Sequence, residues 1–485
     1  MTKLDPMVPQ VDWEAAALIP QSMAKRQRLL AVGFAGEELV VVCAGEADPI
    51  ALEEVRQVTG RALRVQKAEE AAVDQALRTV YARLSAHRAL RDMRLGVSGG
   101  LEQPGRTEAP VVRLLESFLR QAAALRASDI HIEPYETQTL VRMRVDGVIG
   151  DYMKLPGEVH QTLIARVKIL SGLDIAERRI PQDGHFRFDG EEGGIHIRVS
   201  LLPTVFGEKA VLRLLAASGQ VEDHVERFGM NEAVYRRFAP LLSVPNGILY
   251  VTGPTGSGKS TTLYMILEHL SKGAVNIATI EDPVERNLFR VNQTQVGPNL
   301  SFEKGLRAIL RQDPDIIMVG ETRDAETAEI SVRSAITGHM VLSTLHTNDA
   351  VSTILRLRDM GIEPYLIANS LMGVVAQRLL RKTCPHCGRE MAAAGEELAF
   401  WGSPVVRRGQ GCLHCGGTGY RGRIAIHELL VVDRTLRRMI AQGADLEAME
   451  EHARGVQGMR TLQEQAADLV RLGVTTPEEA ARVVS

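Results

Sequence analysis

The chain is short of aromatic residues, cysteine, lysine and long apolar runs. Of its 485 residues, 4% are aromatic, five are cysteine and ten are lysine, so arginine supplies most of the 57 basic side chains. No apolar run reaches the roughly 20 residues that a membrane-spanning helix needs, and residues 1–20 lack the apolar centre of a signal peptide. The net charge of −3 offers nucleic acid no broad positive surface. We therefore expect a cytoplasmic protein with no nucleic-acid partner.

The pattern of apolar residues indicates several α/β domains. Residues 29–86 follow the order strand, strand, helix, strand, helix, and the Gly- and Pro-rich segment 96–110 predicts a flexible linker. After it, an amphipathic helix precedes five segments of alternating polarity, which indicates a sheet with one solvated face. Residues 244–380 alternate strands and helices, as in a mainly parallel sheet with helices on both faces. The predicted fold class is therefore α/β multidomain.

The solvated face of the predicted sheet is rich in arginine. Taken singly, each arginine fits an ordinary exposed strand position. As a set they are a candidate contact for an anion, and the set consists of Arg142, Arg144, Arg187, Arg198 and Arg213.

A nucleotide-binding motif follows an apolar strand in the third unit. GPTGSGKST fits G-x-x-x-x-G-K-[ST], comes directly after ILYVT and runs into a helix-forming segment, which is the context that this motif requires. Its glycines let backbone N–H groups converge on phosphate oxygens. We expect Lys259 to reach the β- and γ-phosphates and the Ser260 hydroxyl to bind Mg²⁺. The predicted phosphate-binding residues are Gly253, Pro254, Thr255, Gly256, Ser257, Gly258, Lys259, Ser260 and Thr261.

Carboxylates follow two of the other predicted strands. Hydrolysis needs a group that orients or deprotonates water, and the segment TIEDPVE supplies Glu281, Asp282 and Glu285 as candidates. The strand in DPDIIMVGETRD ends in Gly320 and Glu321, where a phosphate-binding domain usually has an Asp that helps to hold magnesium. Glu321 is a strong candidate for a catalytic carboxylate.

Two histidines flank the apolar strand MVLSTL. His339 precedes this strand and His346 follows it, which is an unusual place for two imidazoles that only pack. A structural role explains each of them as well as a catalytic role does.

Four of the five cysteines form two C-x-x-C pairs, separated by 24 residues. This is close to the spacing of a structural Zn²⁺ site, in which four thiolates leave no open position for catalysis. Disulfides are the alternative and are less favoured in a cytosolic protein. His386 and His414 lie inside the two turns and are not expected to be ligands. The four predicted ligands are Cys384, Cys387, Cys412 and Cys415.

These motifs together resemble those of the secretion-ATPase superfamily, the hexameric motors of type II secretion and type IV pilus assembly. GPTGSGKST, TIEDPVE, RQDPDIIMVGETRD and TGHMVLSTLHTN carry the resemblance, which extends from ASDIHIEPYE and ERRIPQDG to CPHCG and GCLHCGGTGYRGR. It implies a PAS-like α+β domain that bears the arginines, a RecA-like ATPase domain with a zinc-binding insertion, and a helical C-terminus.

The resemblance also implies roles for individual residues. Glu321 would be the general base, and the three carboxylates of TIEDPVE would form an acidic box that helps with water and metal. The two histidines match the family's histidine box. The phosphate-contacting arginines would be Arg198, Arg307 and Arg311. One position departs from the pattern, because His185 stands where relatives usually have an arginine that crosses to a neighbouring nucleotide.

The function implied by the resemblance is ATP hydrolysis by a homo-hexamer that drives pseudopilus assembly in type II secretion. Its expected partners are the cytoplasmic domain of a GspL-like inner-membrane protein, bound by the N-terminal domain, and a GspF-like membrane platform protein, so the chain would attach peripherally to the inner membrane. The alternatives are a type IV pilus-assembly ATPase and a scaffold that binds ATP without hydrolysing it. The expected domains are 1–95 (partner docking), 96–110 (linker), 111–218 (PAS-like), 219–380 (RecA-like), 381–425 (zinc) and 426–485 (helical).

Overall fold

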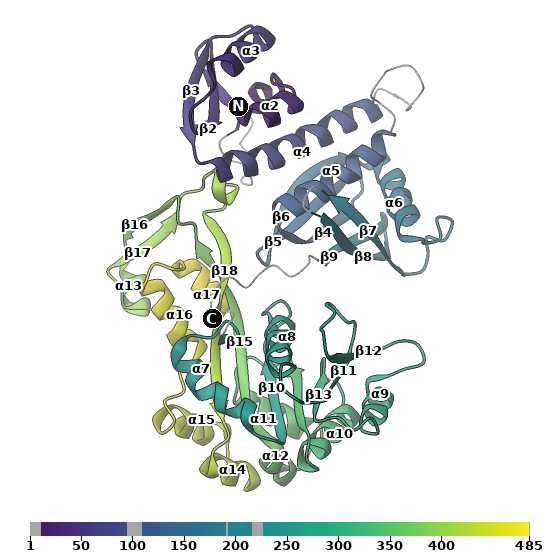
Figure 1. Ribbon diagram of the computed structural model, residues 1–485, viewed down its shortest axis with the longest axis vertical. Coiled ribbons are helices and arrows are strands. Elements are labelled where there is room, and N and C mark those ends of the chain that lie inside the picture. The colour runs from purple at the N-terminus through teal and green to yellow at the C-terminus, as the bar shows by residue number, and fades with distance from the viewer. Residues whose placement is uncertain (1–10, 95–108, 191–192, 216–226, 485) are drawn as a thin grey trace. The chain divides into compact units, whose positions relative to one another are not determined.

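The computed structural model describes residues 11–94, 109–190, 193–215 and 227–484, which form two compact units. One unit contains the N-terminal domain, the arginine-bearing sheet domain and the loops that carry the cysteines. The other contains the P-loop domain and the C-terminal helices (Figure 1). Within the described residues, no helix combines the length and the apolar character needed to cross a membrane.

The N-terminal domain is built on a three-stranded sheet in the order β1-β2-β3. The predicted order of strands and helices is found, and two short helices precede it. Asp12 and Asp48 cap the helices that follow them, because each side chain accepts hydrogen bonds from backbone N–H groups of the first turn. The elements are α1 (Trp13–Ala17), α2 (Gln21–Gln27), β1 (Leu29–Ala35), β2 (Glu38–Ala44), α3 (Pro49–Thr59), β3 (Leu63–Ala68) and α4 (Glu70–Arg94).

The second domain is a six-stranded antiparallel sheet in the order β6-β5-β4-β9-β8-β7. Alternate strand residues turn inward and form one core with α5 and α6. Five of the strands match the predicted segments, whereas β6 was missed because glycine and aspartate interrupt its apolar alternation. The elements are α5 (Pro110–Ala124), β4 (Ala127–Pro134), β5 (Gln138–Val145), β6 (Val148–Pro156), α6 (Gly157–Ser171), β7 (Gln182–Gly190), β8 (Gly193–Thr204) and β9 (Gly207–Leu215).

Helix α4 belongs to two cores. Val73 and Leu77, in its first half, are buried in the core of the N-terminal domain. Ala86 and Ala89, in its second half, are buried in the core of the sheet domain, where α4 lies along α5 (Figure 1). The N-terminal and sheet domains are therefore joined by a shared helix. Residues 96–108 of the predicted linker lie outside the described residues.

The P-loop domain contains a seven-stranded sheet in the order β12-β11-β13-β14-β10-β15-β18. Its first six strands in this order pair in parallel, as the alternation of strands and helices predicts. The carboxyl ends of these strands therefore meet at one edge of the sheet. The elements are α7 (Glu232–Phe238), η2 (Ala239–Ser243), β10 (Gly247–Thr252), α8 (Lys259–Leu270), β11 (Ile277–Glu281), β12 (Val291–Gln295), α9 (Phe302–Ile309), β13 (Ile316–Val319), α10 (Ala325–Ile336), β14 (Met340–Leu345), α11 (Ser352–Asp359), α12 (Pro364–Ser370) and β15 (Leu371–Thr383).

The C-terminal helices complete the P-loop domain. Leu436 and Leu462 are buried in the same core as Ile248 and Val341 of the sheet, so the last helices share the core of the domain that precedes them. The remaining elements are β16 (Gly388–Ala392), α13 (Gly395–Trp401), β17 (Val405–Gly409), η3 (Leu413–Cys415), β18 (Tyr420–Val431), α14 (Arg434–Ala441), α15 (Leu446–Gly455), α16 (Leu462–Arg471) and α17 (Pro477–Val484).

Candidate nucleotide and zinc sites

The P-loop joins the carboxyl end of β10 to the start of α8. At Gly253 and Gly258, φ is +146° and +91°, and a Cβ atom would lie 2.5 Å and 2.7 Å from atoms of Gln377, so these positions require glycine. Helix α8 begins without a side-chain cap, which leaves its first N–H groups available to phosphate oxygens. The loop therefore fits the phosphates of ATP. Its exposed residues are Pro254, Thr255, Gly256, Ser260 and Thr261.

Lys259 lies along the P-loop that it belongs to. Its Nζ donates hydrogen bonds to the carbonyl oxygens of Gly253 at 2.8 Å and Pro254 at 3.1 Å. Burial, and then the positive charge of Arg378, lower the pKa of Lys259 to about 8. Lys259 therefore loses its proton more readily than an exposed lysine does. A phosphate group beside it would favour the charged form.

Two residues of β15 support the P-loop and were not predicted from the sequence. The Gln377 side chain donates to the carbonyl oxygen of Ser257 at 2.9 Å and accepts from the Thr262 hydroxyl at 2.8 Å, so it fastens the loop and α8 to the sheet. The next residue, Arg378, supplies the charge that acts on Lys259. Their only sequence signal was a polar pair that interrupts the apolar run of this strand.

The acidic box divides into a buried member and two exposed members. Glu281 ends β11 and is 3% exposed. Its oxygens accept hydrogen bonds from the side chains of Tyr264, Thr279 and Gln293. The Tyr264 hydroxyl also accepts a hydrogen bond from the backbone N–H of Glu285 at 3.0 Å, so one tyrosine of α8 organises the segment. Asp282 and Glu285 are exposed and face solvent.

Glu321 lies just beyond β13, at the same edge of the sheet as the P-loop. Its side chain is 20% exposed and is ion-paired with Arg323, whose Nη1 also lies 3.7 Å from Oδ2 of Asp282. A Cβ atom at Gly320 would lie 3.2 Å from the carbonyl oxygen of Ile280 on β11. Close packing of the two backbones thus leaves little room at position 320 for an aspartate, and Glu321 is the first carboxylate after the strand.

The two histidines lie at opposite ends of β14. His346 follows the strand, and its Nε2 lies 3.9 Å from Oε2 of Glu321. Burial, and then the charges of Lys259 and Arg323, lower the pKa of His346, so its imidazole is neutral at neutral pH. His339 precedes β14 and its carbonyl oxygen accepts from the N–H of Gly247, at the start of β10. Six strand residues span about 20 Å, so the structure does not bring His339 together with Glu321 and the P-loop of the same subunit.

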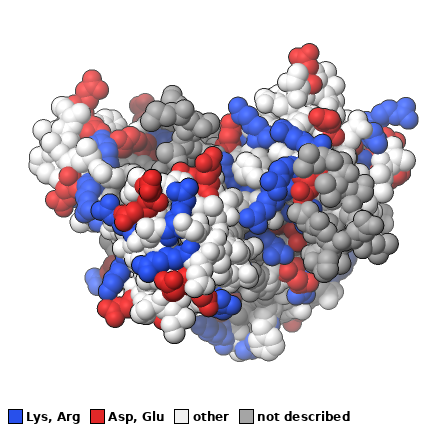
Figure 2. All heavy atoms as spheres, turned by 90° about the horizontal axis from the view of Figure 1, so that it is seen from above, with Lys and Arg blue, Asp and Glu red and all other residues white. Residues whose placement is uncertain are grey.

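The candidate arginines of the sheet domain are mostly paired with carboxylates. The pairs are Arg142 with Glu133, Arg144 and Arg213 with Asp129, and Arg187 with Asp189. Basic and acidic side chains are likewise interspersed on the face that Figure 2 shows. Arg198 is exposed and has no ion-pair partner within the described residues. It lies between His185 on β7 and Arg213 on β9 in the register of the sheet, so it is the arginine of this set that is available to an anion.

Arg307 and Arg311 lie on α9 and in the turn after it. Arg307 is ion-paired with Glu303 at 3.0 Å, and Arg311 donates a hydrogen bond to the carbonyl oxygen of Arg307 at 2.8 Å. Within the part of the chain that the structure describes, no hydrogen bond or ion pair joins either arginine to the P-loop.

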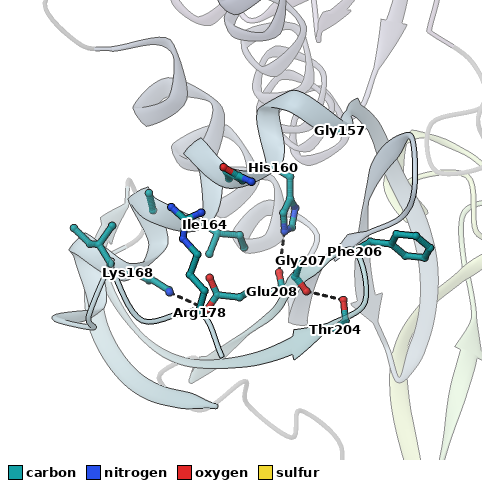
Figure 3. Close-up of a pocket in the computed structure, with 12 residues that line it drawn as sticks. Gly157, His160, Ile164, Lys168, Arg178, Thr204, Phe206, Gly207 and Glu208 are labelled. Atoms are coloured by element: carbon teal, nitrogen blue, oxygen red, sulfur yellow. Dashed lines mark hydrogen bonds and ion pairs between the residues drawn. The ribbon is translucent and has the colours of Figure 1, made fainter. Parts of the chain in front are cut away.

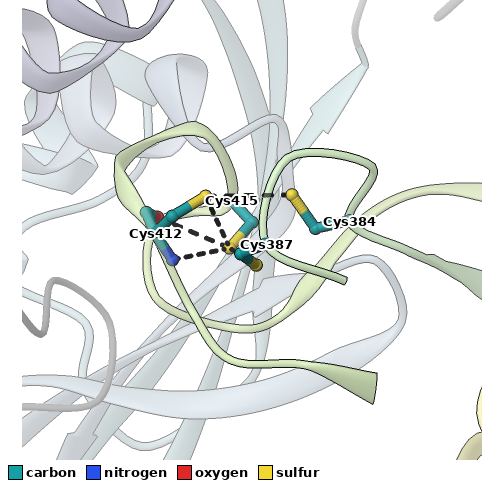
Figure 4. A group of neighbouring side chains, drawn as sticks. All are labelled: Cys384, Cys387, Cys412 and Cys415. Carbon is teal, nitrogen blue, oxygen red and sulfur yellow. Dashed lines mark hydrogen bonds between the residues drawn. The ribbon is translucent and has the colours of Figure 1, made fainter. Parts of the chain in front are cut away.

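The four cysteines of the two C-x-x-C turns converge, as Figure 4 shows. Their Sγ atoms all lie within 4.8 Å of one another, and the Cys384–Cys412 and Cys387–Cys415 separations are 3.9 Å and 3.8 Å. Four ligands at a Zn–S distance of about 2.3 Å would be roughly 3.8 Å apart in a tetrahedron. The thiols are free and too far apart for disulfides. The donor set therefore fits a closed structural Zn²⁺ site, which braces the two turns.

Comparison with known proteins settles the family. A family model described as "Type II/IV secretion system protein" matches residues 105–482. The chain belongs to this family of secretion ATPases. A second model, which describes an N-terminal domain of "GSPII protein E", matches residues 18–81. The resemblance inferred from the motifs, the α/β multidomain fold class and the ATPase assignment with ATP, Mg²⁺ and Zn²⁺ are thereby confirmed.

Members of the family resemble the chain over most of its length. The "Type II secretion system protein E" of Dickeya dadantii (strain 3937) is 41% identical over 97% of this chain and 97% of its own. The "Type IV pilus assembly ATPase PilB" of Thermus thermophilus is 40% identical over 98% of this chain, which spans 55% of that relative. The crystal structure of the pilus retraction motor PilT with bound ADP is 27% identical, covers 75% of this chain and 95% of its own, and has a TM-score of 0.51.

Proposed function

We propose that this chain is the motor of a type II secretion system, in which it hydrolyses ATP to drive pseudopilus assembly and protein export. The observation that supports this most strongly is the placement of the P-loop and Glu321 at one edge of a parallel sheet. The match of residues 18–81 to a domain of the type II protein favours that branch of the family.

In the proposed mechanism, each group at this edge has a separate task. Lys259 and the N–H groups of the P-loop bind the β- and γ-phosphates, and Ser260 would hold Mg²⁺, which neutralises phosphate charge when bound. Glu321 accepts the proton of the attacking water. His346, neutral and next to Glu321, positions that carboxylate or the water by hydrogen bonding. Asp282 and Glu285 would help to hold the metal through water. Glu281, which is buried and accepts three hydrogen bonds, positions this segment.

Arginine side chains would add to the P-loop in stabilising the negative charge of the γ-phosphate. Arg198 is the strongest candidate because it is exposed and has no carboxylate partner within the described residues. Arg307 and Arg311 contribute in the same way when the subunits assemble. His185 offers at most a partial charge and no bidentate fork, so stabilisation of the γ-phosphate rests more on Arg198 here than in relatives with an arginine at position 185.

Assembly into a homo-hexamer would bring the sheet domain of one subunit to the nucleotide of the next, since a head-to-tail contact that closes makes a ring. Exposed apolar residues of the sheet domain support this, because large exposed apolar side chains can mark interaction sites. They are Ile169, Ile175, Ile180, Leu202, Val205 and Phe206, and two of them, Ile175 and Phe206, line one cavity. The lining of this cavity of about 160 Å³ also includes Lys168 and Glu208, which form a buried ion pair (Figure 3).

The contribution of these apolar residues is tested with the substitution Phe206→Asp. We expect sedimentation velocity with Mg²⁺ and a slowly hydrolysed ATP analogue to show rings for the unchanged chain and monomers for Phe206→Asp. Ile50→Asp is the control, because Ile50 is 71% exposed on α3 of the N-terminal domain, which is not proposed as a contact of the ring. Unchanged assembly of Phe206→Asp would exclude these residues as a subunit contact.

The N-terminal domain, up to residue 95, would dock on the cytoplasmic domain of an inner-membrane secretion protein, and a membrane platform protein would receive the motion. The chain would then lie at the cytoplasmic face of the inner membrane. Residues 111–218 would then be the moving PAS-like domain and 219–380 the RecA-like domain, with 381–425 as the zinc subdomain and 426–485 as the helical end.

The catalytic proposal is tested by comparing two conservative substitutions. Glu321→Gln removes the general base and should lower the steady-state ATPase rate by about 10²- to 10⁴-fold while nucleotide binding persists. Glu329→Gln is the matched control, because Glu329 lies on the next helix and is paired with Arg333 at the surface. Equal ATPase rates for Glu321→Gln and the unchanged chain would exclude Glu321 as the general base. No turnover in the unchanged chain itself would favour the non-hydrolysing scaffold.

A type IV pilus-assembly motor is the second candidate, favoured by the 40% identity to the Thermus PilB. Deleting the N-terminal domain is a poor test, because α4 also fills the core of the sheet domain. Pull-down of the full chain with the cytoplasmic domain of a type II inner-membrane protein, in parallel with its pilus counterpart, separates the two machines. Binding to the pilus partner alone would overturn the type II assignment.

A further inference from the structure

A second group of metal-binding side chains lies beside the four cysteines. It consists of Glu69, which immediately precedes α4, and of His386 and His414, the residues inside the two C-x-x-C turns. All three belong to the same compact unit. Neither the nucleotide site nor the four-thiolate site uses them.

The distances within this group are those between ligands of one ion. The His386 Nδ1 and His414 Nε2 atoms lie 3.5 Å and 3.6 Å from the same oxygen, Oε2 of Glu69, and the three candidate ligand atoms are within 4.8 Å of one another. These separations are longer than hydrogen bonds, which extend to about 3.2 Å. Nitrogen and oxygen ligands at about 2.1 Å from a tetrahedral ion would be roughly 3.4 Å apart.

The two imidazole rings of this group are packed in an unusual way. The rings of His386 and His414 are stacked with centroids 3.6 Å apart and planes inclined by 1°. Free aromatic rings prefer offset or edge-to-face arrangements to a face-to-face sandwich. In this arrangement one nitrogen of each ring is turned toward the same oxygen, Oε2 of Glu69, so the stacking brings the three candidate ligand atoms together.

We propose that Glu69, His386 and His414 bind a second divalent transition-metal ion of the zinc class, separate from the ion of the cysteine cluster. Because each nitrogen lone pair lies in the plane of its own ring, the two rings must rotate away from their parallel arrangement to direct both lone pairs at one ion. Three protein ligands leave one position for water. Because Glu69 comes from the N-terminal domain and the histidines from the two turns, the ion would fasten the start of α4 to the zinc-binding loops.

The number of ions per chain tests this proposal. The full chain is saturated with Zn²⁺, freed of loosely bound ions by gel filtration and analysed by atomic emission. We expect two ions per chain for the unchanged protein and one for Glu69→Gln and His386→Asn. The control His452→Asn should keep two, since His452 lies outside the cluster and pairs with Asp433. The Glu69 side chain is 59% exposed, so its substitution leaves the fold intact.

Cobalt substitution identifies the ligands of each ion. The first equivalent of Co²⁺ should give the strong thiolate charge-transfer absorption of the four-cysteine site, and the second should add only weak d–d bands. Loss of the second step in Glu69→Gln, with the first unchanged, would support the proposal. One ion per saturated chain, two ions in Glu69→Gln, or loss of both ions in His386→Asn would overturn it.

Discussion

The lowered pKa of Lys259 predicts that nucleotide binding weakens at mildly alkaline pH. Burial and the charge of Arg378 bring this pKa to about 8, from 10.5. With a pKa of about 8, the charged fraction of the amine falls from about nine-tenths at about pH 7 to about one-tenth at about pH 9. Only the charged amine binds phosphate well, so the Kd for Mg-ATP should rise about tenfold, or about 1.4 kcal/mol. A lysine with the ordinary pKa would leave the Kd nearly constant.

Fluorescence titration with an ATP analogue in excess Mg²⁺ at constant ionic strength measures this change. Lys259→Arg is the matched control, because a guanidinium remains charged across the range, so its weaker binding should not vary with pH. Arg378→Gln removes the second cause of the shift and should move the loss of affinity to higher pH. A Kd that stays constant over this range in the unchanged chain would refute the reasoning.

Three further predictions concern single side chains. Hydrogen bonds from Arg142 and Lys209 outweigh burial and lower the pKa of Glu133 from 4.5 to about 2. Its ionisation therefore stabilises the fold at neutral pH by up to about 3 kcal/mol and ceases to do so as pH falls from 4.5 toward 2. Urea unfolding of Glu133→Gln should show this loss at pH 7 but not in acid, and equal midpoints at pH 7 would contradict it. His346→Ala should lower the ATPase rate by about 10- to 100-fold, whereas His339→Ala should leave it almost unchanged; equal losses would restore both histidines to the site. Tyr264→Phe leaves the buried Glu281 without one donor and should cost about 1.5–3 kcal/mol in thermal unfolding and reduce turnover; an unchanged melting temperature would show that the hydrogen bond contributes nothing.

The sequence predicted those parts of the site that are local in the chain. The P-loop region is a strand, a glycine-rich turn and a helix that follow one another from Gly247 to Leu270, so its motif could be recognised without knowledge of the fold. The same holds for the C-x-x-C turns, whose spacing indicated the ligand set that the structure brings within 4.8 Å. The family resemblance then added the roles of Glu321 and of the arginines.

The sequence could not predict the contacts between segments that are far apart in the chain. Gln377 is 120 residues from Ser257 in the chain and holds its carbonyl. His339 and His346 are equivalent in the sequence, flanking one strand, and only the parallel register of β14 with β10 places one at the nucleotide edge and the other at the opposite edge.

The sequence by itself determined the chemistry available to this protein, because motif residues and their spacing fix which groups can meet phosphate or zinc. Tertiary structure decided which of those groups meet. Gly320 illustrates the difference: in the sequence it looked like a missing metal ligand, yet the backbone of β11 lies so close that a Cβ would be 3.2 Å from a carbonyl oxygen. Strand-to-strand packing at that position, which no local pattern records, disfavours any residue larger than glycine, and the carboxylate stands one residue later.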